Sequence, residues 1–151
     1  MYVYIRTSIY TVNGVHLFKL GITTKLKERE STYVTGEYNR EIFIDVYEIL
    51  SSNKSILKKI DKTLKILLKE YHRQSTGGTE FYDPIIRAKV ESLLNEYKYK
   101  NYDYRKLPDD EIKHIERCNR IQSIIDNLDF MKRYSLCKFV KYIKENSILS
   151  K

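Results

Sequence analysis

The first third of the chain alternates between bulky apolar and polar positions, which is the two-residue period of β-strands. Residues 2–10 and 15–22 are rich in β-branched and aromatic side chains, so each segment predicts a strand. Asn13-Gly14 lies between them, and this pair favours the positive backbone angles of a two-residue hairpin turn. A third strand is predicted over residues 42–50. The chain therefore begins with a β-hairpin, and the third strand follows after a gap.

Farther along, the apolar positions recur every three or four residues, which is the spacing of one helix face. Residues 51–53, Ser-Ser-Asn, are good N-cap candidates for a long amphipathic helix, and Pro84 favours the start of a second helix. The predicted apolar stripes consist of Ile56, Leu57, Ile60, Leu64, Leu67 and Leu68 in the first helix and of Ile86, Val90, Leu93, Leu94 and Tyr97 in the second.

A short helix is expected between the second and third strands. Thr23 or Thr24 can cap it, and it would run through Tyr33 and carry Arg29. After the long helix, a glycine-containing turn presents Glu80 at the start of a short element. This order of elements indicates an α+β fold, in which a small mixed or antiparallel sheet is flanked by helices.

The chain divides into three parts on this interpretation. Residues 1–97 are expected to form the α+β domain. Residues 98–107 are expected to be a connector or an exposed strand, because positions 98–106 contain no aliphatic residue that could join a core. Residues 108–151 form a basic helical region, which begins at Pro108 with acidic residues in its first turn and includes a last helix over about residues 130–144.

The charge balance favours an anionic partner. The 151 residues include 28 Lys and Arg against 20 Asp and Glu, which gives a formal net charge of +8 and a pI near 9.3. A surplus of this kind is common in proteins that bind nucleic acid.

Other features narrow the class of protein. Cys118 and Cys137 form no CxxC motif, so neither a disulfide framework nor a zinc site is indicated, and both are expected to be buried thiols. No apolar run approaches the roughly 20 residues of a membrane span, and the N-terminus lacks the pattern of a signal peptide. We therefore expect an intracellular, soluble protein without membrane contact, located in the cytoplasm or nucleus, or in the host cell if it is viral. P-loop, G-x-S-x-G, H-E-x-x-H and EF-hand motifs are absent from the sequence.

One spaced series of residues does carry chemistry. It consists of Tyr2-Val3-Tyr4, Lys19-Leu20-Gly21, Arg29 and Gly78-Thr79-Glu80-Phe81. These segments supply a phenol, an amine, a guanidinium and a carboxylate. Hydrolysis of a phosphodiester requires a base for water, positive charge on the phosphate oxygens and commonly a divalent metal. The series contains a candidate for each of these tasks.

The order and spacing of this series resemble the GIY-YIG nuclease domain over residues 1–83, in the divergent phage and large-DNA-virus branch whose second signature often reads Lys-Ile-Gly. The resemblance implies a metal-dependent endonuclease that acts on double-stranded or branched DNA. By this resemblance, Tyr4 matches the tyrosine of the first signature, Arg29 matches the helical arginine, and Glu80 matches the glutamate that holds Mg²⁺ or Mn²⁺. Lys19 replaces the tyrosine of the second signature, and a lysine can orient water or stabilise phosphate charge.

Five further residues are candidates for substrate contact: Tyr2, Gly21, Tyr33, His72 and Arg73. Tyr2 shares a strand face with Tyr4 and competes with it for the match. Gly21 favours a tight turn or the close approach of a substrate. Each candidate also has an ordinary structural explanation, such as a sheet aromatic, a turn glycine or a solvated charge on a helix.

Two other functions remain open from the sequence. A noncatalytic nucleic-acid-binding module would keep the fold and its basic surface without cleavage. A viral structural or interaction protein would use the C-terminal helices as a docking surface. The nuclease requires Glu80 and a metal ion, whereas the binding module requires only the basic surface.

Overall fold

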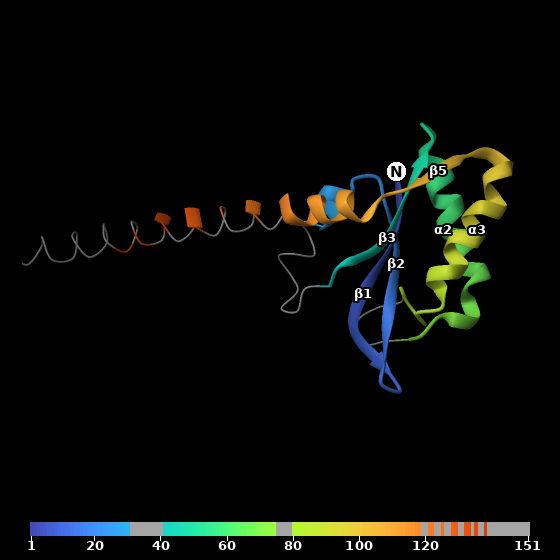
Figure 1. Ribbon diagram of the computed structural model, residues 1–151, viewed down its shortest axis with the longest axis horizontal. Coiled ribbons are helices and arrows are strands. Elements are labelled where there is room, and N and C mark those ends of the chain that lie inside the picture. The colour runs from blue at the N-terminus through green and yellow to red at the C-terminus, as the bar shows by residue number, and fades with distance from the viewer. Residues whose placement is uncertain are drawn as a thin grey trace, which may run out of the picture.

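The computed structural model contains one five-stranded antiparallel sheet with the strand order β4-β2-β1-β3-β5 (Figure 1). The structure describes residues 1–30, 41–74 and 80–118, together with single helical positions between residues 121 and 138. The strands are β1 (Tyr2–Val12), β2 (Val15–Thr23), β3 (Phe43–Leu50), β4 (Phe81–Tyr82) and β5 (Asp103–Lys106). The α+β class predicted from the sequence is confirmed.

The hairpin between β1 and β2 forms at the predicted turn. Val12 pairs with Val15, and the two residues between them have positive φ angles, 52° at Asn13 and 78° at Gly14. These are the backbone angles of a type I′ turn, whose twist matches that of the flanking strands. The local Asn-Gly signal therefore sets the pairing of the two strands at the centre of the sheet.

Two helices, α2 (Lys54–Leu67) and α3 (Ile86–Asn101), lie side by side on one face of the sheet (Figure 1). Asn53 caps α2 as predicted, because its side-chain oxygen accepts a hydrogen bond from the backbone N–H of Ser55 at 3.0 Å. The short 3₁₀ helix η1 (Lys69–Tyr71) follows α2. The buried core on this side consists of Val3, Ile5, Leu20, Tyr47, Ile49, Leu57, Ile60, Leu64, Leu68, Tyr82, Ile86, Val90 and Leu94.

A second, smaller core lies on the opposite face of the sheet. It is covered by the helical residues 26–30 and 109–118. Its buried members are Tyr4, Leu26, Phe43, Val46, Leu107, Ile112 and Ile115. Because successive residues of a strand point to opposite faces, Tyr4 belongs to this core while its neighbours Val3 and Ile5 belong to the first.

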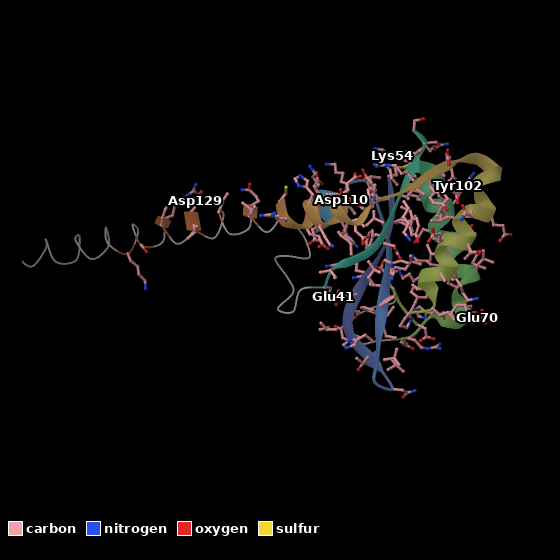
Figure 2. The ribbon with its side chains drawn as sticks, viewed as in Figure 1. Glu41, Lys54, Glu70, Tyr102, Asp110 and Asp129 are labelled. Atoms are coloured by element: carbon pink, nitrogen blue, oxygen red, sulfur yellow. The ribbon has the colours of Figure 1, made fainter. Side chains whose placement is uncertain are left out.

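The segment between α3 and the last helical stretch contributes to the sheet. Residues 98–101 continue α3, and β5 pairs with β3 over the following residues. The backbone N–H of Leu107 donates to the carbonyl of Val46 at 2.8 Å, and the Leu107 side chain is buried. This pairing brings the helix that starts at residue 109 onto the face of the sheet opposite α2 and α3. Asp110, labelled in Figure 2, marks the start of this helix.

The prediction of a buried thiol is wrong for Cys118. Cys118 is exposed, and its Sγ lies 3.5 Å from Nε2 of His114 one turn earlier. The physical reason is its distance along the helix, because every described position from residue 117 onward is exposed and Ile115 and Glu116 are the last buried ones. Cys137 and most of the helix predicted over residues 130–144 lie outside the described residues. Within the part that the structure describes, no helix is both long and apolar enough to cross a membrane.

Tyr47 gives a prediction for stability. Its side chain is fully buried, and its hydroxyl has no hydrogen-bond partner among the described residues. Since a buried polar group without a partner destabilises the fold, we expect Tyr47→Phe to raise the free energy of unfolding near neutral pH by about 1 kcal/mol. Urea denaturation of both proteins measures this difference. Tyr104→Phe is the control, because the Tyr104 hydroxyl donates to Asn95 at 2.7 Å, and this substitution should give no gain.

The same substitution should change the response to alkaline pH. Burial, and then the negative charge of Asp45, raise the pKa of Tyr47 above its ordinary value of 10.0. The unfolded chain therefore loses this proton first as the pH rises. The resulting contribution to stability is complete below about pH 10 and is lost above it. Stability of Tyr47→Phe should fall less steeply than that of the wild type above this pH, and equal slopes would contradict the account.

Candidate functional site

The two central strands bring part of the predicted series onto one face of the sheet. In the β1–β2 register, Tyr4 lies opposite Gly21 and Arg6 lies opposite Lys19. Directly opposed residues of an antiparallel pair project from the same face. This is the face covered by the helical residues 26–30 and 109–118. Tyr4, Lys19 and Gly21 therefore share one environment, as their sequence spacing suggests.

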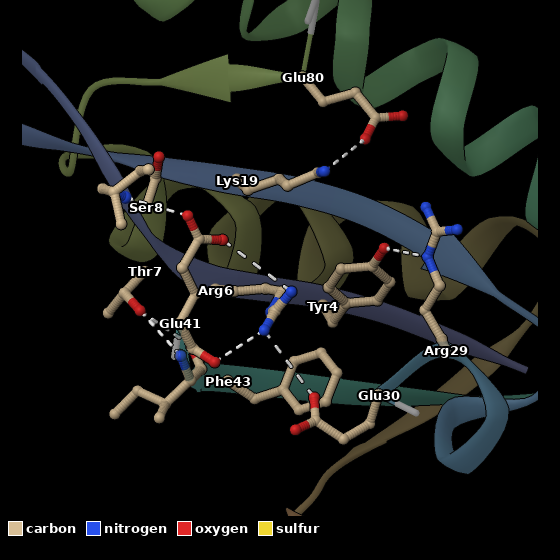
Figure 3. A network of polar contacts seen from close by, with 12 residues as sticks. Tyr4, Arg6, Thr7, Ser8, Lys19, Arg29, Glu30, Glu41, Phe43 and Glu80 are labelled. Carbon is tan, nitrogen blue, oxygen red and sulfur yellow. Dashed lines mark hydrogen bonds and ion pairs between the residues drawn. The ribbon is translucent and has the colours of Figure 1, made fainter. Parts of the chain in front are cut away.

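Tyr4 and Arg29 are in direct contact. The Nε of Arg29 donates a hydrogen bond to the Tyr4 hydroxyl oxygen at 3.0 Å, although the two residues are 25 positions apart (Figure 3). Tyr4 is fully buried, whereas Arg29 is partly exposed. The contact fixes the orientation of the guanidinium plane relative to the sheet.

The turn before the helix determines where Arg29 lies. The hydroxyl of Thr23, at the end of β2, accepts a hydrogen bond from the backbone N–H of Lys25 at 3.1 Å. The carbonyl of Lys25 then accepts from the N–H of Arg29, also at 3.1 Å, in the first turn of the helix. Threonine is thus the residue that organises the helix start, as the sequence predicted. Arg29 is held one turn beyond the end of a sheet strand.

Gly21 provides the space for the Tyr4 ring. A Cβ atom at this position would lie 2.3 Å from the Tyr4 hydroxyl oxygen and 2.4 Å from Cζ, which is far inside van der Waals contact. Gly21 lies within β2 and not at a turn. Its absent side chain lets the tyrosine lie across the neighbouring strand and reach Arg29.

Gly21→Ala should therefore displace the Tyr4 ring. We expect a loss of about 1–3 kcal/mol in the free energy of unfolding, which is typical of overpacking in a core. Urea denaturation of single and double variants tests the cause. In the Tyr4→Ala background the ring is gone, so the added methyl group should cost much less there. An equal cost in both backgrounds would show that the clash with Tyr4 is not the reason.

Lys19 and Glu80 form the second pair of the site. Lys19 Nζ lies 3.9 Å from Glu80 Oε2, and the side chains are 19% and 36% exposed (Figure 3). Glu80 directly precedes β4, and its backbone carbonyl accepts from the N–H of Leu20 at 3.1 Å. Lys19 also lies above the ring of Phe81, with Nζ 5.7 Å from the centroid. Glu80 is thus held at the sheet edge by backbone pairing, and not on a helix.

An open depression of about 210 Å³ lies beside Arg29. It is lined by Thr23, Thr24, Lys25, Glu28 and Arg29. Lys25 and Glu28 form an exposed ion pair with Nζ and Oε1 2.6 Å apart. The Thr24 hydroxyl and the Arg29 guanidinium can donate hydrogen bonds to the oxygens of a phosphate group, whereas the Thr23 hydroxyl already donates to the carbonyl of Lys25 at 3.2 Å.

Arg6 is a residue of this site that the sequence analysis missed. It is fully buried, and its Nη2 donates to the backbone carbonyl of Glu41 at 2.7 Å. Its guanidinium nitrogens also lie 3.9 Å from a carboxylate oxygen of Glu30 and 3.9 Å from one of Glu41 (Figure 3). Arg6 therefore links β1 to Glu30, the neighbour of Arg29. The signal in the sequence was its position two residues after Tyr4, on the same strand face.

Tyr2 lies on the face of Tyr4 but has a different partner. Its hydroxyl donates to Glu48 at 3.3 Å, and burial is the main cause that raises its pKa. Tyr33 lies outside the described residues.

His72 and Arg73 have structural partners near β4. The His72 ring packs edge-on against Tyr82, whose side chain belongs to the core on the α2 and α3 side. Arg73 forms an ion pair with Asp83 and donates to the backbone carbonyl of Glu70 at 3.0 Å. The structure therefore joins Tyr4 to Arg29 and Lys19 to Glu80, and it gives His72 and Arg73 partners in or next to β4.

Glu80 is the candidate metal ligand of the site. Among the described residues, no group of three or more His, Cys, Asp or Glu side chains could hold a metal ion. A single accessible carboxylate suits Mg²⁺, which prefers to keep several of its waters. The Lys19 ammonium competes with a cation for the same oxygens. A magnesium ion at this position would have Glu80 as its side-chain ligand and would keep waters at its other positions.

The chain was compared with protein-family models, curated proteins and solved structures, and no match was found. The functional assignment therefore depends on the chemistry and geometry of the site itself.

Proposed function

We propose that this protein is a metal-dependent endonuclease that hydrolyses DNA phosphodiester bonds at a site of the GIY-YIG type. The observation that carries the proposal is the convergence of Tyr4 with Arg29 and of Lys19 with Glu80, from four separate segments of the chain. One fold can host many functions, so these side chains, and not the fold, indicate the activity. Their chemistry is that of a site for an anionic ester.

Arg29 is the group that would hold the scissile phosphate. A guanidinium presents two parallel N–H donors to phosphate oxygens and keeps its charge at all physiological pH values. Tyr4 accepts from Nε and is fully buried, which favours a role in orienting Arg29 over direct contact with water. The depression beside Arg29 offers room for the phosphate and one flanking sugar.

Lys19 and Glu80 would act on the other side of the reacting group. Both are accessible to solvent, so Lys19 can orient the attacking water or stabilise negative charge that develops on the phosphate. Glu80 would hold Mg²⁺ or Mn²⁺, and a bound metal would supply positive charge for the phosphate oxygens and the leaving oxygen.

Glu80→Gln tests the metal role. We expect this variant to lose metal-dependent nicking of supercoiled DNA by about 100-fold or more, because an amide is a much weaker ligand for Mg²⁺. Nicking rates are measured over a range of Mg²⁺ and Mn²⁺ concentrations. Glu96→Gln is the matched control, since Glu96 is an exposed carboxylate on α3, outside the site. Equal loss in both variants, or full activity in EDTA, would contradict the assignment.

One observation favours a second candidate, a noncatalytic DNA-binding module of the same fold. The Lys19–Glu80 ion pair partly neutralises the carboxylate that a metal ion requires. A binding module would bind DNA with the same affinity in EDTA as in Mg²⁺, and Glu80→Gln would leave this affinity unchanged. Intact DNA in every metal condition, together with such binding, would favour this candidate over the nuclease.

A further inference from the structure

A row of exposed lysines follows one flank of α2 and continues into η1. It consists of Lys54, Lys58, Lys62, Lys65 and Lys69. Steps of three and four residues keep these side chains on one side of the helix. Lys65 forms an ion pair with Asp61 at 2.9 Å, and it is the one member of the row with an ion pair within the described part of the chain. Figure 2 labels Lys54 and Glu70, which mark the two ends of this segment.

The charge of this segment is large for its size. Between residues 54 and 71 there are six lysines and two acids, Asp61 and Glu70, so the surplus is half of the chain's net charge of +8. An exposed row of ammonium groups is a concentrated positive surface, whereas a typical solvated helix alternates charges of both signs.

The row lies on the side of the sheet edge that carries Glu80. Helix α2 contacts β1 and β2, whereas α3 contacts β5, so α2 covers the half of the sheet that ends in β4. The hydrogen bond to Asp61 is the main cause that raises the pKa of Lys65, and the charge of Glu80 adds to the effect. Figure 3 shows the Glu80 carboxylate beside a green helix, the colour of α2. The Lys65 end of the row therefore lies near Glu80 of the Lys19–Glu80 pair.

We propose that this lysine row binds the sugar-phosphate backbone of double-stranded DNA and directs one strand toward the Lys19–Glu80 edge. The inference rests on the proposed function and names its docking surface. At about 1.5 Å per residue, the helix from Lys54 to Lys65 is about 17 Å long, and successive lysines of the row are about 4.5 to 6 Å apart along it, so the row can follow a short stretch of one phosphate backbone. Lysine contacts with phosphates carry no base-sequence information, so binding should be independent of sequence.

The test compares two sets of four substitutions. The first removes the unpaired lysines of the row: Lys54→Gln, Lys58→Gln, Lys62→Gln and Lys69→Gln. The second removes four exposed charges from the C-terminal helical region: Lys113→Gln, Arg117→Gln, Lys132→Gln and Arg133→Gln. Glutamine retains high helix propensity, and circular dichroism checks the fold of each variant. Affinity for a DNA duplex of arbitrary sequence is measured in EDTA over a series of salt concentrations, so the result is independent of cleavage.

We expect the dependence of log K on log salt concentration to become shallower by about 3 to 4 in the first variant, because each lost phosphate contact removes about 0.9. The second variant should keep the wild-type slope to within about 1. The reverse pattern, or equal changes in both, would overturn the inference. Absence of duplex binding by the wild-type protein would also overturn it and would favour an acidic protein as the partner of this row. If the first result holds but no condition gives cleavage, the docking surface stands and the proposed hydrolysis fails.

Discussion

Replacement of Arg29 by alanine is expected to lower the rate of DNA cleavage by about 100-fold or more, while DNA affinity changes by only a few-fold. Removal of one preorganised donor to a developing charge costs this much in other hydrolytic sites. Arg29 is the guanidinium that the structure orients, through the 3.0 Å hydrogen bond from its Nε to Tyr4. Affinity should change little, since one contact among many phosphate contacts contributes modestly to binding. Single-turnover nicking of supercoiled DNA and binding in EDTA measure the two quantities separately.

Two further variants show whether the geometry of the guanidinium or its charge accounts for the loss of cleavage rate. Arg29→Lys keeps the charge but loses both the Nε donor to Tyr4 and the parallel donor pair, so its rate should remain far below that of the wild type. Lys27→Ala removes an exposed charge from the same helical segment and should leave the rate within about two-fold. Retention of more than half of the wild-type rate by Arg29→Ala would contradict the role of this residue.

Arg6→Met is expected to give the largest loss of stability, about 3–5 kcal/mol in the free energy of unfolding. Arg6 is fully buried between the carboxylates of Glu30 and Glu41, which are also buried. Methionine occupies a similar space but leaves two negative charges without their compensating cation, and such a loss is strongly destabilising. Urea denaturation of the wild type and the variant measures the difference.

Two controls separate burial from simple loss of charge. The triple variant Arg6→Met, Glu30→Gln, Glu41→Gln removes the uncompensated charges together with the cation, so it should recover a large part of the lost stability. Arg105→Met breaks exposed ion pairs with Glu48 and Glu111 and should leave stability nearly unchanged. A loss below about 1 kcal/mol for Arg6→Met would show that the buried ion pairs do not stabilise the fold.

The parts of the fold that the sequence predicted are those with local signals. Asn13-Gly14 predicted the hairpin because only a few residue types accept the positive φ angles of its turn. Asn53 predicted the start of α2 because its side chain satisfies a backbone N–H within two residues. The two-residue period of a strand predicted that Tyr2 and Tyr4 share a face, and the register of the hairpin adds Gly21 and Lys19 to this face.

The remaining features depend on contacts between distant segments. The pairing of β5 with β3 could not be predicted from the β5 sequence, Asp-Tyr-Arg-Lys. An exposed edge strand lacks the apolar alternation that identifies a half-buried strand. The linkage of Arg6 to Glu30 and Glu41 spans 24 and 35 positions, so no local pattern reveals it. The burial of Tyr4 over Gly21 likewise became evident only from the pairing of the strands.

The nuclease proposal is best tested by nicking of supercoiled DNA with the wild-type protein in Mg²⁺, with EDTA and the Glu80→Gln and Arg29→Ala variants in parallel. We expect nicking that requires the metal and is lost in both variants. Intact DNA with the wild-type protein in both Mg²⁺ and Mn²⁺, or nicking that persists in both variants, would contradict it.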